Sequence, residues 1–250
     1  MIEVSNWTDL VSEISAVTTE DKDISLSSDI VLDDDILSSI NRPNNKYTIT
    51  IHGNGHKIQN LYCDKNIVVF NGYNHRKLIF QDLFFDSVQI ENGMLFRDVT
   101  LDRCQLSCEL IDAQLNYGVK FNQCGLNIVG YGIKSAISLS DDKPSTKCNI
   151  EIHGAFKELC FTLNHSWLIG KCGVIDKLSF NGSKLSFIDA EILSEGAEVT
   201  SYDSSFLVYN KDKFQGIQMP PWTTGVTEQQ MHDVEYLRSI GYPIRRRVEL

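Results

Sequence analysis

The sequence lacks any apolar run that approaches the roughly 20 residues needed for a membrane-spanning helix. Its first residues also lack the basic-then-apolar order of a signal peptide, so we expect a chain made in a cytosol, with no membrane partner. Basic residues are few, because 23 Lys and Arg stand against 33 Asp and Glu, and the net charge is -10. A nucleic-acid-binding protein usually carries a basic face, so this composition disfavours nucleic acid as a partner.

The chain has an odd number of cysteines, and they are scattered along the sequence. Among the seven cysteines only Cys104 and Cys108 lie close together, and there is no Cys-x-x-Cys motif. A zinc site or a disulfide framework would show closer and more regular spacing. We therefore expect reduced, buried thiols, with no metal and no cofactor.

Helical periodicity is missing from about residue 46 to residue 210, which disfavours alternating strands and helices. Near the start, helical spacing of apolar residues predicts a short helix over residues 7–17, with Asn6 or Thr8 as its N-cap. Near the end, Thr227 and Gln230 fit a capping box, which predicts a helix that begins at Thr227. The apolar stripe of this second helix would be Met231, Val234, Leu237 and Ile240.

Short strand-like segments fill the space between these helices. Ile24–Leu26 and Ile30–Leu32 are interpreted as a strand pair separated by three polar residues. In Lys46–Leu61, alternation of apolar and polar residues predicts two short strands around a Gly53-Asn54-Gly55 corner. Gly and Asn suit such a corner because both tolerate positive φ.

A loose pattern of apolar residues followed by Asp, Asn or Gly recurs along the middle of the chain. Its intervals of about 16 to 30 residues suit a solenoid whose turns differ in loop length. The copies begin at Leu78, Met94, Val119 and Leu178, with a weaker copy at Val199. An Ile-His-Gly step at His52 and again at His153 is interpreted as a repeated corner. Stacked turns would bury the apolar face that a single turn cannot bury.

A sandwich of two antiparallel sheets is the structural alternative. It requires hairpin turns of the Asn-Gly kind at intervals of about 8–12 residues. Asn71-Gly72, Asn92-Gly93 and Asn181-Gly182 keep this alternative open. In the favoured all-β coil, residues 1–22 form an N-terminal cap helix, residues 23–214 form the coil, and residues 215–250 form a C-terminal docking helix and tail.

The segments around Trp7–Val17, Ile24–Leu32 and Thr48–Ile58 together resemble the opening of the pectin-lyase-like right-handed parallel β-helix proteins. In that family a short helix caps the open end of the coil, and a Gly-Asn-Gly segment forms an early turn. The resemblance extends by pattern over residues 1–210 and implies a single-stranded, right-handed parallel β-helix. The family includes polysaccharide lyases and hydrolases, bacterial surface proteins and virion proteins of tailed phages. Thr227–Ile244 is similar to the tail of some phage structural proteins.

An enzyme of this family would need clustered carboxylates, because one acts as an acid while the other activates water or attacks. The Asp-Asp pairs at residues 33–35 and 141–142 lie beside the first strands and in a predicted loop, and no Gly-His-Gly occurs. A lyase would need calcium, which takes six to eight oxygen ligands. The candidates for that site are Asp82, Asp86, Asp98 and Asp102, with Arg97 or Arg103 as base. We interpret these aspartates as exposed corner residues and assign no catalytic and no metal-binding residue.

Aromatic residues are frequent in the strand-like segments. They include Phe84, Phe85, Phe161, Trp167, Phe187, Tyr202, Phe206 and Tyr209. A solvent-exposed row of such rings would indicate a carbohydrate-binding, adhesin-like module with a surface glycan as its partner. Stacking within the core is the commoner arrangement.

Partner contacts are expected at the C-terminal end, where a Trp in a Pro-rich loop suits an interface anchor. The candidate residues are Trp222, Met231, Val234, Leu237, Arg245, Arg246 and Arg247. We predict a non-enzymatic component of a phage virion, such as a spike, fibre or decoration protein, made in the bacterial host cytoplasm. It would dock to other virion proteins or to further copies of itself, for example as a trimer. The alternatives are a polysaccharide lyase or glycoside hydrolase, and a carbohydrate-binding adhesin-like module.

Overall fold

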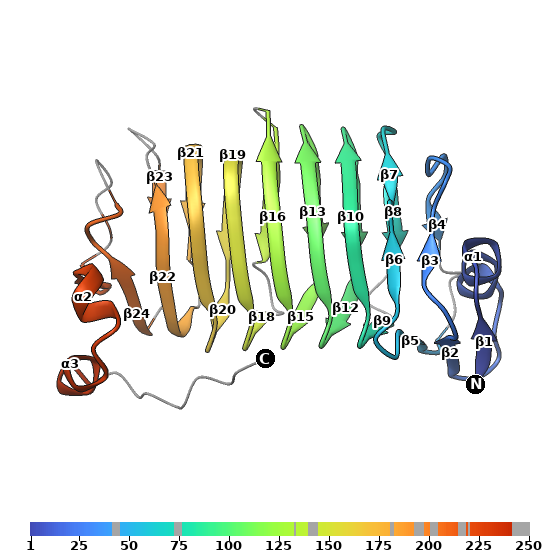
Figure 1. Cartoon of the computed structure of the whole chain (residues 1–250), viewed down its shortest axis with the longest axis horizontal. Coiled ribbons are helices and arrows are strands. Elements are labelled where there is room, and N and C mark those ends of the chain that lie inside the picture. Colours follow the sequence, from blue (N-terminus) through green and yellow to red (C-terminus); the bar gives the residue numbers. More distant parts are fainter. Residues whose placement is uncertain are drawn as a thin grey trace.

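The chain coils so that its strands stack side by side along one axis (Figure 1). The computed structural model describes residues 1–41, 46–72, 77–132, 134–139, 145–180, 183–192, 198–200, 205–214, 219 and 221–241. Every strand pairing within these ranges is parallel. The antiparallel sandwich is therefore excluded, and the curled parallel sheet fits a β-helix.

The strands form three faces, here called A, B and C, of one curled sheet. Face A contains β1 (Ile2–Val4), β2 (Lys22–Leu26), β5 (Ile49–His52), β9 (Leu78–Gln81), β12 (Val99–Asp102), β15 (Lys120–Asn122), β18 (Ser145–Thr146) and β20 (Leu163–Asn164). Face B contains β3 (Ile30–Val31), β6 (Lys57–Gln59), β7 (Tyr62–Cys63), β10 (Phe84–Glu91), β13 (Gln105–Ile111), β16 (Gly125–Tyr131) and β25 (Thr224–Val226). Face C contains β4 (Ile40–Asn41), β8 (Val68–Asn71), β11 (Met94–Arg97), β14 (Gln114–Tyr117), β17 (Ala136–Leu139) and β23 (Glu198–Thr200).

Four strands turn from one face into the next. Strands β19 (Asn149–Phe161) and β21 (Trp167–Ser179) run from face B into face C, and β22 (Lys184–Ile192) and β24 (Ser205–Asn210) run from face A into face B. Residues paired on successive turns are between 16 positions apart, as for Val208 and Thr224, and 30 positions apart, as for Ile40 and Phe70. The expected irregular turn length is confirmed.

The corners between faces are formed by residues with positive φ. Asp82 (50°), Arg103 (53°) and Gln123 (53°) occupy the corner between faces A and B in successive turns, and Asp98 (52°) lies between faces C and A. The sequence copies that begin at Leu78 and Met94 therefore end at different corners, and β9 pairs with β12 rather than with β11. The expectation that these copies mark successive turns is wrong, because one turn contains several corners of similar composition.

Two further local expectations are corrected. The segments β2 and β3 do not pair with each other, because residues 27–29 form a corner between faces A and B, and each strand pairs with a strand of a neighbouring turn. The Ile-His-Gly steps are not equivalent either. His52 ends β5 before the corner at Asn54 (φ 55°), whereas His153 lies within β19, next to a register shift after Gly154.

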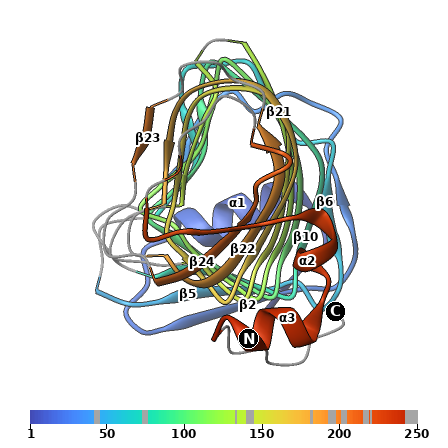
Figure 2. The same cartoon turned by 90° about the vertical axis from the view of Figure 1, so that its left-hand side faces the viewer.

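Helices lie at both ends of the coil. The first, α1 (Trp7–Ser15), has Asn6 as N-cap and lies across the end of the coil in the end-on view (Figure 2). Its Leu10 and Ile14 are fully buried in the main core, so a helix is present in the predicted segment and packs on the coil. At the other end the expected single helix is two, α2 (Glu228–Met231) and α3 (Val234–Ser239). The Thr227 capping box is present, but the Asp233 side chain accepts hydrogen bonds from two following amides and begins a new helix.

In the described residues the buried side chains are mostly apolar. Four phenylalanines from the three faces meet there, with ring centroids 5.1 to 6.3 Å apart, namely Phe70, Phe80, Phe85 and Phe96. All seven cysteines are free thiols and six of them are buried, as expected. Burial raises the pKa of Cys172 to about 12, so this thiol stays protonated at neutral pH.

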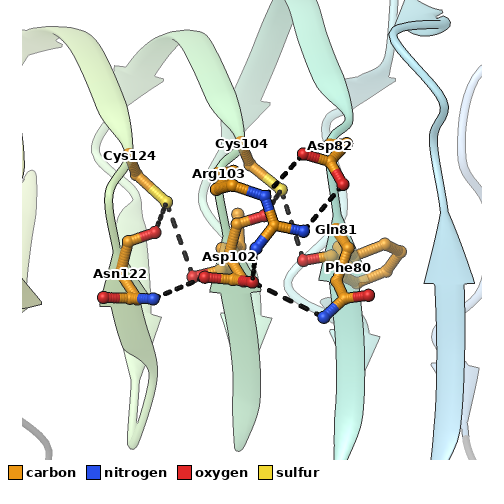
Figure 3. Close-up of polar contacts among 9 residues, drawn as sticks. Phe80, Gln81, Asp82, Asp102, Arg103, Cys104, Asn122 and Cys124 are labelled. Atoms are coloured by element: carbon orange, nitrogen blue, oxygen red, sulfur yellow. Dashed lines mark hydrogen bonds and ion pairs between the residues drawn. The ribbon is translucent and has the colours of Figure 1, made fainter. Parts of the chain in front are cut away.

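Polar side chains form a ladder along the corner between faces A and B (Figure 3). The Arg103 guanidinium donates from Nε and Nη2 to the two carboxylate oxygens of Asp82, over 2.7 and 2.8 Å, and from Nη1 to Asp102. Asp102 also accepts from the side-chain amides of Asn122 and Gln81. The ladder joins three successive turns, and the hydrogen bonds from Arg103 lower the pKa of Asp82 within it.

None of the described helices has the length and hydrophobicity that crossing a membrane requires.

A pair of adjacent phenylalanines tests where the core lies. Phe85 is 1% exposed and Phe84 is 38% exposed. We expect Phe85→Ala to lower the free energy of unfolding by about 3–5 kcal/mol, because it leaves a cavity among packed rings. Phe84→Ala, the matched control, should cost under about 1 kcal/mol. Urea denaturation followed by circular dichroism measures both, and equal losses would contradict the assigned inward and outward faces.

The corner ladder predicts a pH-dependent contribution to stability. Because the pKa of Asp82 is lowered in the folded chain, the contribution of its pair with Arg103 is present above the ordinary aspartate pKa and disappears as pH falls through the folded value. Both side chains are about half exposed, so we expect Arg103→Ala to cost only about 0.5–1 kcal/mol near neutral pH.

Gln123→Ala is the control, since Gln123 occupies the same corner one turn later with the same positive φ. Urea denaturation at about pH 7 and about pH 2.5 should show the Arg103→Ala deficit shrinking in acid. A deficit that is unchanged between the two pH values, or equal in the control, would show that the ion pair does not contribute.

Candidate ligand-binding groove on face B

The outward side of face B, which is turned toward the viewer in Figure 1, carries a groove of about 510 Å³. One row of residues crosses it in strict register from strand to strand, namely Phe84, Gln105, Gly125, Asn149 and Trp167. Neighbouring strands lie about 4.8 Å apart, so the row spans about 19 Å from Phe84 to Trp167. A second row runs beside it through Ser107, Asn127, Glu151 and Ile169.

Strand alternation explains why these side chains face solvent. Their neighbours in sequence, Phe85, Leu106, Leu126, Ile150 and Leu168, are all buried in the core. Since successive side chains of a strand point to opposite sides, burial of these five turns the groove residues outward. The face is therefore apolar on the inside and mixed, polar and aromatic, on the outside.

Glycine makes the centre of the groove shallow. A Cβ atom at residue 125 would lie only 2.0 Å from Oε1 of Gln105. Gly125 therefore leaves room for the Gln105 side chain to lie along the face and over the centre of the groove.

Aromatic rings lie on both sides of the polar part of the row, and the register continues beyond them to Lys57 and Phe187. Phe84 is partly exposed on one side. On the other, Trp167 packs on Phe187 with ring centroids 4.5 Å apart and an interplanar angle of 30°. Two ring surfaces thus bracket the polar middle of the groove.

Four polar side chains in the groove have no partner in the protein. Within the described part of the chain, the side chains of Gln105, Ser107, Asn127 and Asn149 make no hydrogen bond. Some amides elsewhere on the coil are engaged, as when Asn122 donates to Asp102. The groove amides can therefore donate to and accept from a ligand.

The charged groups of the groove are paired with each other or with neighbours. Lys57 Nζ lies 3.3 Å from Asp86 Oδ2, and Gln59 donates to the same oxygen over 3.0 Å. The hydrogen bonds from Gln59 and Lys57 lower the pKa of Asp86. Across the groove, Glu151 lies 2.8 Å from Nε2 of His153. The lining thus combines neutral hydrogen-bonding groups with carboxylates that already have hydrogen-bond partners in the protein.

The C-terminal helices form a wall at the end of the groove. Met231 and Leu237 are buried in a second apolar cluster with Val208 and Val226. Trp167, Phe187 and Tyr236 pack against this cluster from its edge. The same Trp167 therefore lines the groove and supports the helices, so the wall holds its ring in place.

A polar network ties this wall to the coil. Asn210 donates to Asp189 and to Glu228, and Lys213 lies 2.8 Å from Asp189 and 3.3 Å from Glu228. Asp189, Glu228 and His232 are the one group among the described residues that could hold a metal ion. The Lys213 ammonium already supplies the positive charge between these carboxylates, so the network is complete as a structural clasp.

The predicted partner-binding residues are divided by the structure. Trp222 is 48% exposed and Val234 is also exposed, so both are available at the surface. Met231 and Leu237 instead pack on the chain's own coil. Arg245, Arg246 and Arg247 lie outside the described residues.

The four candidate calcium-binding aspartates do not form one site. Asp82 and Asp102 meet only through Arg103 in the corner ladder, Asp86 lies in the groove, and Asp98 is beside Arg97. The two carboxylates of the groove, Asp86 and Glu151, are three strands apart, which is about 14 Å. The two carboxylates of a glycosidase are separated by about 5–10 Å. Asp33, Asp34 and Asp35 are exposed, and Asp141 and Asp142 lie outside the described residues.

The sequence had placed Phe84, Trp167 and Phe187 among candidate sugar-stacking rings, and the structure places these three on the outward face. Phe85 and Phe161 are buried in the core. Tyr202 lies outside the described residues. The polar groove residues were missed, because an Asn or Gln at an alternating strand position carries no signal until the register shows what stands beside it.

Comparison with known families gives one match. The model of a pectate lyase-like adhesive domain matches residues 1–106, less than half of the chain, from the first strand to the start of β13. No curated protein and no solved structure matches the chain. The match to the adhesive domain supports the pectin-lyase-like family for this chain.

Proposed function

We propose that this chain is a non-catalytic, adhesin-like module that binds an extended saccharide in the groove of face B. The observation that carries the proposal is the set of four uncommitted polar side chains between the rings of Phe84 and Trp167. Amides and hydroxyls pair well with sugar hydroxyls, which both donate and accept. Aromatic rings supply apolar surface for a sugar ring. The family match to an adhesive domain points in the same direction.

The absence of catalysis is part of this proposal. A glycosidase needs two carboxylates close enough to act on one bond. In the groove Asp86 and Glu151 are about 14 Å apart by strand spacing, and each is already engaged, by Lys57 and His153 respectively. This arrangement suits retention of a saccharide rather than its cleavage.

The coil is proposed to be right-handed and single-stranded. A connection between parallel strands of one sheet is right-handed in nearly all cases, because twisted strands pack back onto the sheet only that way. A virion role with a trimeric assembly stays a prediction. Exposed Trp222 and Val234 are compatible with it, whereas the matched family model describes an adhesive domain and no phage protein.

Affinity electrophoresis of the purified chain in gels that contain different polysaccharides tests the proposal. We expect retardation by at least one of them, without release of reducing or unsaturated ends. Phe84→Ala should weaken that binding about 5- to 30-fold, as for loss of an aromatic anchor. Asn127→Ala should weaken it about 2- to 10-fold, as for one hydrogen bond.

Tyr117→Ala is the matched control, because Tyr117 is an exposed aromatic residue (54%) on face C, away from the groove. Its affinity should equal that of the unmodified chain. Binding that is lost in the Tyr117 variant but kept in the groove variants would place the site elsewhere. Failure to bind any polysaccharide would refute a glycan-binding function.

A further inference from the structure

We propose that the groove selects an uncharged saccharide chain, bound across the strands from Phe84 toward Trp167. This inference rests on the proposed function and specifies the chemical class of the ligand. It is carried by the charge pairing of the groove, by the chemistry of its uncommitted groups and by the register of the row.

The first step concerns anionic chains. A site for carboxylated or sulfated sugars presents Arg or Lys that is available to the ligand. The only cation that lines this groove within the described residues is Lys57, and its ammonium lies 3.3 Å from the Asp86 carboxylate. Glu151 adds a negative charge near the other end. An anionic chain would meet two carboxylates and no uncompensated cation.

The second step concerns cationic chains, such as those with unacetylated amines. These would need carboxylates that accept from the ligand. Asp86 already accepts from Gln59 and Lys57, and Glu151 pairs with His153. Both carboxylates are already hydrogen-bonded within the protein, so a cationic chain would have to compete with these partners.

The third step concerns what is left uncommitted. Gln105, Asn127, Asn149 and Ser107 each offer donors and acceptors on one neutral group. Sugar hydroxyls and acetamido groups have the same dual character, so neutral chains can satisfy these side chains without any charge. The uncommitted groups occupy successive strands β13, β16 and β19. Contacts can therefore repeat at each strand spacing along an extended chain.

The fourth step gives the direction. The rings of Phe84 and Trp167 lie in one register row, about 19 Å apart by strand spacing. Beyond Trp167, the wall that contains Met231 and Leu237 closes the face. A saccharide that contacts both rings must therefore run along the coil axis, across the strands, and end at or turn away from this wall.

Matched oligosaccharides that differ only in charge test the inference. Suitable pairs are oligogalacturonate and its methyl ester, and chitosan and chitin oligomers of equal length, with xylo- and manno-oligosaccharides as further neutral probes. Isothermal titration calorimetry of the full chain should show neutral probes binding at least about tenfold more tightly than charged counterparts. Tighter binding of a charged member would overturn the inference and leave the glycan-binding function intact. Binding of no probe would overturn both.

A charge-introducing variant separates charge selection from shape. Asn149→Lys places a cation in the groove at an exposed strand position whose register partners, Gly125 and Trp167, carry no charge. It should raise the affinity for oligogalacturonate about fivefold or more and lower the affinity for the neutral probes. Tyr117→Lys, on face C, is the control and should change neither. An unchanged oligogalacturonate affinity in Asn149→Lys would show that the acidic chain is excluded for another reason, and the charge argument would fall.

Discussion

The parallel register between successive turns is the constraint on which the rest of this molecule depends. At the start of face B, the amides of Gln105, Gly125, Asn149 and Trp167 donate to carbonyls of the preceding turn over 2.9 to 3.1 Å. Three of these carbonyls belong to Cys104, Cys124 and Cys148, which follow the positive-φ corners. These hydrogen bonds therefore fix both the corner and the groove row. The distance between the two rings of the row is set by the number of strands between them and by the strand spacing.

The register also decides what a side chain can do. Inside the coil it brings rings and thiols of neighbouring turns together, so that no turn needs to bury its own apolar face. At the corners it brings polar groups together, and Arg103, Asp82, Asp102 and Asn122 satisfy one another. On the outward side of face B the stacked neighbours are amides and a glycine, which leave one another unsatisfied. Whether these amide side chains have hydrogen-bond partners therefore depends on which residues the register places beside them, and not on any single residue.

The sequence could predict those features that depend on residues close together in the chain. Asn6, the Thr227 capping box and the Gly53-Asn54-Gly55 corner depend only on residues a few positions apart, and each is present. The register was out of reach, because turns of 16 to 30 residues give no fixed period and several corners of one turn share the same composition. For the same reason Phe84 and Phe85 could be named as aromatic candidates, but not sorted into groove and core.

The C-terminal segment shows how register changes the meaning of a correct local prediction. Its amphipathic helices were read as a docking element for a partner, and the apolar residues Met231 and Leu237 do dock, on the chain's own Val208 and Val226. Because Trp167 and Phe187 pack at the edge of that cluster, the wall immobilises one ring of the groove before any ligand arrives. A ring that is already fixed loses less conformational freedom on binding. Among the described residues Phe84 stacks on no other ring, so the support that Phe187 and the wall give Trp167 has no aromatic counterpart at the other side of the groove.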